Sequence, residues 1–148
     1  MDGHGIHYVW NDHALNLLSA IKWLLNRQRS PANCGTTVAV AGAFAITAAQ
    51  IRDFSHYSGT AGGAVAFTFP GAELVLAALT HAASIGDTWD LYLRITDANP
   101  MTITAGAGDT LISQGGNEVV QAETVHLQYK FTNVTTGTAA AEIWVLDM

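Results

Sequence analysis

The sequence predicts a mainly β domain, a sandwich or a barrel, that follows one long helix. Three observations support this expectation. Short β-like runs recur about every 8–12 residues, turns with Gly or Asn separate them, and a single early segment has clear helical periodicity. The length of 148 residues fits one folded domain. We therefore expect an arm and helix over residues 1–30 and a β-domain over residues 31–148.

The long helix is expected within residues 12–29. Apolar residues over 14–25 follow helical spacing, and Pro31 lies just beyond the expected end. Arg27 and Arg29 lie in the last turn, where the helix dipole favours cations. The helix either packs on the β-domain or serves as a docking element, and the sequence supports both alternatives equally.

Two segments show the alternation of a half-buried strand most clearly. Residues 88–96 and 123–134 alternate apolar with polar side chains. Their apolar sides are expected to face inward, and they comprise Trp89, Leu91, Leu93, Ile95, Val125, Leu127, Tyr129 and Phe131. Further strands are expected over residues 36–47, 62–70, 101–105, 110–113 and 139–148, with a short helix within 71–87.

Composition limits the classes of function. Hydrophobic residues make up 49% of the chain and charged residues 12%, whereas about 25% charged residues is usual. We therefore expect part of the surface to lie against other subunits, near residues 36–51 or 64–69. The net charge of −6, without a basic stripe, argues against nucleic acid as a partner. The apolar runs are far shorter than the roughly 20 residues of a membrane helix, so no membrane partner is expected.

The stretch Gly106-Ala107-Gly108-Asp109 raises the question of a phosphate-binding loop. A dinucleotide loop needs a third Gly and a following helix, and a P-loop needs Lys and Ser or Thr after its glycines. Neither pattern is present, and a strand pattern follows instead. These glycines are therefore predicted to be turn residues in a corner of the β-structure.

Other patterns of catalytic or ligand-binding residues are weak. His4 and His7 are close in sequence, but no Cys or paired acid completes a metal set with them. The sequence contains no Gly-x-Ser-x-Gly stretch. Trp89 lies on the apolar side of its strand, which favours core packing over stacking on a sugar. We expect no catalytic residue, no cofactor and no metal.

The order of these pieces resembles the small decoration or cement proteins of tailed-phage capsids. The likeness rests on Gly86-Asp87 ahead of an alternating strand, on TITAGAG at 102–108, and on FTNVT at 131–135 before a final strand. The segment ITAAQI at 46–51 and the short helical segment after Pro70 also look similar. The resemblance covers about residues 36–146 and leaves the arm and helix uncovered.

This resemblance implies a jelly-roll-like antiparallel β-sandwich without catalytic residues. It also implies a homotrimer that clamps neighbouring major capsid protein subunits on the exterior of the virion head, assembled in the host cytoplasm. Because the family pattern does not cover the arm and helix, we expect the specific capsid contact there, from Ile6, Tyr8, Val9, Trp10, Arg27 and Arg29. The alternative is a phage fibre or receptor-binding module that takes sugar, and a small enzyme is a third class.

Overall fold

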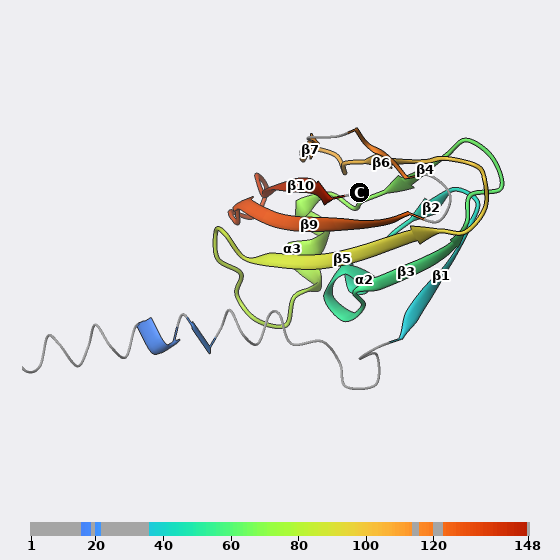
Figure 1. Ribbon diagram of the computed structural model, residues 1–148. Helices are drawn as coiled ribbons and strands as arrows, with labels where there is room; N and C mark the ends of the chain where they lie inside the picture. The colour runs from blue at the N-terminus through green and yellow to red at the C-terminus, as the bar shows by residue number, and fades with distance from the viewer. Residues whose placement is uncertain (1–15, 19, 22–35, 114–115, 120–122, 148) are drawn as a thin grey trace, which may run out of the picture.

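A computed structural model describes residues 16–18, 20–21, 36–113, 116–119 and 123–147. Residues 16–18 and 20–21 are helical, and the remainder of the expected arm and helix lies outside the described residues. Two sheets and two short helices form the main body (Figure 1). In chain order its elements are β1 (Thr37–Ala41), β2 (Phe44–Ala45), α2 (Ala48–Asp53), β3 (His56–Thr60), β4 (Val65–Thr68), α3 (Ala72–Ala78), β5 (Thr88–Ile95), β6 (Met101–Thr104), β7 (Thr110–Ser113), β8 (Glu118–Val119), β9 (Thr124–Asn133) and β10 (Ala140–Asp147).

The chain alternates between the two sheets over its first six strands. β1, β3 and β5 belong to a six-stranded sheet of order β1-β3-β5-β9-β10-β7, and β2, β4 and β6 to a four-stranded sheet of order β2-β4-β6-β8. Side chains from both sheets share one buried cluster, as in a sandwich. The expectation of a mainly β sandwich is confirmed.

Strand direction departs from the antiparallel jelly-roll pattern. The pairs β1–β3, β3–β5, β2–β4, β4–β6 and β7–β10 are parallel, whereas β5–β9, β9–β10 and β6–β8 are antiparallel. The alternation between sheets explains the parallel pairs among β1 to β6. A strand that returns to its own sheet after a passage through the other sheet runs in the same direction as its predecessor, because it has made a crossover. Apolar–polar alternation within a strand does not encode that direction.

The core is built as the two alternating strands predict. Trp89 is 1% exposed, and the other seven residues expected to face inward from β5 and β9 are fully buried. Phe67, Met101 and Ile103 close the core from the four-stranded sheet. The expected strands are present, while β3, β8 and α2 were not predicted, and α3 ends at Ala78, well before the expected end.

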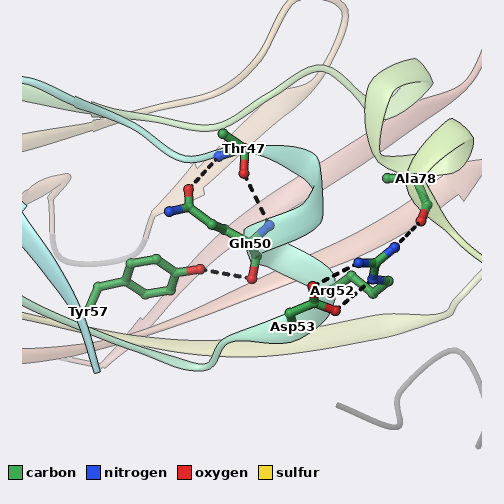
Figure 2. A network of polar contacts seen from close by, with 6 residues as sticks. All are labelled: Thr47, Gln50, Arg52, Asp53, Tyr57 and Ala78. Carbon is green, nitrogen blue, oxygen red and sulfur yellow. Dashed lines mark hydrogen bonds and ion pairs between the residues drawn. The ribbon is translucent and has the colours of Figure 1, made fainter. Parts of the chain in front are cut away.

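Polar contacts join α2 to its neighbours (Figure 2). The Thr47 hydroxyl accepts from the Gln50 backbone N–H at 3.2 Å, and the Gln50 side-chain oxygen accepts from the Thr47 N–H at 2.9 Å, which forms a capping box. The Tyr57 hydroxyl of β3 donates to the Gln50 carbonyl at 3.0 Å, and Arg52 donates to the Ala78 carbonyl at 2.8 Å. A cation therefore meets the C-terminal end of α3, where the helix dipole favours it.

The glycine stretch is a corner between β6 and β7, as predicted. Gly108 has φ 83°, which L side chains rarely adopt. A Cβ on Gly106 would lie 2.4 Å from the backbone N of Gly71, so only glycine fits against the start of α3. Asp109 then accepts from the Ala141 N–H at 3.0 Å and fixes the corner to β10.

Candidate functional site

The outer face of the six-stranded sheet carries polar and aromatic side chains in rows across neighbouring strands. One row follows the register pairs Thr37–His56, His56–Tyr92 and Tyr92–His126. The adjacent row pairs Ser58 with Arg94 and Arg94 with Thr124. Because side chains alternate along each strand, these residues lie opposite the core residues of β3, β5 and β9.

Three rings of the first row form a stack that we call the ring ladder, made of His56, Tyr92 and His126. The centroids of the His56 and Tyr92 rings are 5.3 Å apart with an interplanar angle of 22°, and those of Tyr92 and His126 are 4.8 Å apart with an angle of 14°. The Tyr92 ring therefore has an imidazole stacked on it from each side, one from each neighbouring strand.

Hydrogen bonds hold the two ends of the ladder. His126 Nε2 lies 3.1 Å from Asp90 Oδ1, and the Gln128 amide donates to the same oxygen at 3.1 Å. At the other end, Ser55 Oγ lies 2.9 Å from His56 Nδ1. Because the His126–Asp90 pair is partly exposed, it contributes little stability by itself, but it limits the rotamers of the ring.

A shallow depression of about 260 Å³ lies beside the ladder. Its lining includes Thr37, His56, Ser58, Tyr92, Arg94 and Thr124. The aliphatic hydroxyl groups of Thr37, Ser58 and Thr124 and the Arg94 guanidinium can therefore donate hydrogen bonds to a group that enters it. We call this feature the Arg94 depression.

Arg94 differs from the other cations of the described body, residues 36–147. Arg52 forms an ion pair with Asp53 at 2.6 Å, and Lys130 lies 3.9 Å from Glu142. Arg94 is exposed and, among the described residues, has no ion-pair or hydrogen-bond partner. The outer face thus offers one unpaired positive charge in a chain of net charge −6.

On β9 and β10, the polar side chains of the outer face bind one another. Trp144 donates from its indole nitrogen to Glu142 Oε2 at 3.0 Å, and Glu142 is also the partner of Lys130. Trp144 is half-buried. These side chains satisfy one another, which leaves the Arg94 depression as the stronger candidate for binding.

A buried polar pair lies on the opposite side of the same sheet. Asp109 Oδ2 and Tyr129 Oη are both inaccessible to solvent and have no hydrogen-bond partner among the described residues. Burial raises the pKa of Asp109, although hydrogen bonds from the backbone of Ala141 and Ala72 oppose the shift. Burial, together with the charge of Asp109, also raises the pKa of Tyr129. Because Tyr129 is fully buried, we assign this pair to the core rather than to a binding site.

The residues predicted to dock on a capsid lie outside the described residues: Ile6, Tyr8, Val9, Trp10, Arg27 and Arg29. His4 and His7 lie outside them as well. Trp89 is a core residue, as predicted. Among the described residues, no group of three or more His, Cys, Asp or Glu side chains is placed to hold a metal ion.

The sequence analysis did not predict the Arg94 depression, although the sequence does indicate some of the residues on this face. Alternation in β5 and β9 predicts that Tyr92, Arg94 and His126 point outward, and they do. His56 and Ser58 belong to β3, which the pattern does not reveal. The position of β3 beside β5 is what brings the two sets together.

No helix in the described part of the chain is long and apolar enough to cross a membrane. Comparisons of the chain with protein families, with curated proteins and with solved structures find no match.

Proposed function

We propose that this chain is a structural protein of a tailed-phage virion, a decoration or cement protein that binds the major capsid protein and stabilises the head shell from outside. The observation that carries the proposal is the outer face of the six-stranded sheet. There the stacked rings of the ring ladder lie beside the Arg94 depression, which is open to a partner. Tyr and Arg are residue types that often anchor protein interfaces. The resemblance of residues 36–146 to decoration proteins supplies the identity of the partner.

Exposed apolar residues in the helical segment give independent support. Leu17, Leu18 and Ile21 are 62%, 49% and 41% exposed. Clustered apolar side chains of this size are costly in water unless a partner covers them. A homotrimer, or the capsid surface, would provide that cover.

The alternative of a sugar-binding fibre or receptor-binding module has less support from the described residues. A sugar stacks on an open aromatic face, but imidazoles stack on Tyr92 from both neighbouring strands. Trp89 is buried in the core, and Trp144 is half-buried with its indole nitrogen bound to Glu142.

Co-sedimentation tests the proposal against this alternative. The purified chain is mixed with phage heads assembled without it, with heads that already carry it, and with purified glycan from the host cell surface. We expect saturable binding to the undecorated heads, little binding to the decorated heads, and none to the glycan. Binding to glycan alone, or to neither target, would overturn the proposal.

Truncation tests the part of the proposal that concerns the arm. We expect removal of residues 1–11 to leave the melting temperature nearly unchanged, because the core cluster lies within residues 40–145. Occupancy on undecorated heads should fall sharply, because Ile6, Tyr8, Val9 and Trp10 are lost. Unchanged occupancy would move the capsid contact from the arm to the sandwich.

A further inference from the structure

We infer that the Arg94 depression receives a carboxylate side chain of the protein to which this chain binds. The inference rests on the proposed function and adds the chemistry of one contact. It concerns the outer face of β1, β3, β5 and β9, which is separate from the arm that the sequence marks for docking.

Charge provides the first reason. Among the described residues Arg94 is the cation without a partner, and it stands on a sheet face rather than on a flexible loop. A guanidinium presents its N–H groups as a planar fork that matches the two oxygens of a carboxylate. The hydroxyls of Ser58 and Thr124, on the strands to either side, can donate to the same group.

Rigidity provides the second reason. Tyr92 forms one wall of the depression and is stacked by His56 on one strand and by His126 on the other. Asp90 Oδ1 lies 3.1 Å from His126 Nε2 and holds that ring in place. A wall whose rotamers are already fixed loses little side-chain entropy when a partner arrives, and that saving favours binding.

Other ligand classes fit this surface less well. A sugar would need an open aromatic face, whereas His56 and His126 already stack on the Tyr92 ring. A nucleic-acid backbone would need several cations in a row, whereas Arg94 is the one Lys or Arg among the described residues that line the depression. One guanidinium with neighbouring hydroxyls suits a single carboxylate from an acidic patch on a protein.

Binding of variants to undecorated heads tests the inference. Arg94→Ala and Arg94→Glu remove or reverse the charge, and Arg94→Lys keeps it. Lys130→Ala is the matched control, because Lys130 lies on the same sheet face but already has Glu142 as its partner. We expect Arg94→Ala to weaken binding about 30-fold or more, Arg94→Glu to weaken it further, and Lys130→Ala to change it little. All variants should keep the wild-type melting temperature, since the Arg94 side chain has no ion pair or hydrogen bond among the described residues and the partly exposed Lys130–Glu142 pair contributes little stability.

A cross-link identifies the partner group. A carbodiimide activates a carboxylate, which then forms an amide with a nearby amine. The amine introduced by Arg94→Lys should therefore become joined to an Asp or Glu of the major capsid protein, and mass spectrometry of the linked peptide identifies that acid. Replacement of this acid by Arg on the shell should restore the binding of Arg94→Glu, as a charge swap requires.

The outcomes separate the inference from the function on which it rests. If the wild-type chain does not bind heads, the proposed function is overturned and the inference falls with it. If the wild type binds and Arg94→Ala binds equally well, the inference alone is overturned and the decoration function stands. Binding by Arg94→Lys without a cross-link to any Asp or Glu would also overturn the carboxylate assignment.

Discussion

Leu93 and Arg94 are adjacent in β5, and their side chains lie on opposite faces of the six-stranded sheet. Leu93 is fully buried in the core, whereas Arg94 is exposed on the outer face. We predict that Leu93→Ala lowers the free energy of unfolding by about 2–5 kcal/mol, because it removes buried methyl groups and leaves a cavity. Arg94→Ala should change it by less than about 0.5 kcal/mol. Urea unfolding of both variants measures the difference, and similar losses would contradict the register of β5.

Asp109 leads to a second prediction, which concerns the pH dependence of stability. Burial raises its pKa in the folded chain, so the folded state favours the neutral carboxyl group. Its contribution to stability is therefore greatest below the unfolded pKa, about 3.9, and is lost as pH rises through the folded pKa. Asn resembles the neutral form at every pH. We predict that Asp109→Asn gains stability relative to the wild type as pH rises from about 3 to 7.

Thermal unfolding of the two proteins across this pH range measures the effect. Comparison with the wild type at each pH removes the contributions of the other carboxylates, which both proteins share. Asp109→Ala is the control, since it cannot accept from the Ala141 N–H and should be destabilised at every pH. A difference between Asn and wild type that stays constant with pH would show that the folded pKa of Asp109 is not raised.

At the scale of elements, α2 depends strongly on its N-terminal cap. It has only six residues, so the capping box of Thr47 and Gln50 satisfies backbone groups over much of its length. We predict that Thr47→Ala lowers the free energy of unfolding by about 0.5–2 kcal/mol, and that Thr47→Ser recovers most of the loss. Guanidinium unfolding measures both variants. A Ser variant as unstable as the Ala variant would show that the cap oxygen is not the cause.

The sequence identifies some elements and not others for physical reasons. β5 and β9 are buried on one face and exposed on the other, so their alternation is visible without a structure. β3 reads HYSGT, and Ser and Gly carry little strand propensity, so its neighbours in the sheet decide its conformation. α2 is too short for periodicity, and its only sequence signal is Thr47 with Gln50 three residues later.

Neither the strand directions nor the full candidate site could be predicted from the sequence, and the reason is the same for both. Alternation shows which side chains face outward, including Tyr92, Arg94 and His126, but it does not show which strands are neighbours. The parallel pairing of β3 with β5 places His56 and Ser58 beside them, and that pairing results from the chain's passage between the two sheets. The composition of the site was therefore visible in part, while its assembly was not.

At the scale of the whole molecule, β1 is the stronger of the two expected subunit contacts. In the segment 64–69, Phe67 and Phe69 are buried in the core, and β4 lies between β2 and β6. β1 is an edge strand of the six-stranded sheet, and its residues carry no charge that would discourage pairing with another chain.

We therefore predict a closed oligomer, threefold by resemblance, that Ala39→Lys weakens. Ala39 is exposed on β1, so a lysine there would add charge at the edge without disturbing the core. Thr136→Lys, in the exposed turn before β10, is the control. Native mass measurement in dilute buffer should find a trimer for the wild type and the control, and smaller species for Ala39→Lys. A monomeric wild type would contradict the predicted oligomer.

A comparison of head structures tests most directly whether this chain decorates a capsid. Electron cryomicroscopy of heads assembled without the chain, before and after its addition, gives a difference map of the shell. We predict added density on the outer surface that fits the sandwich, with the outer face of the six-stranded sheet turned toward the major capsid protein. Identical maps before and after addition, at concentrations that saturate any binding, would contradict the decoration function.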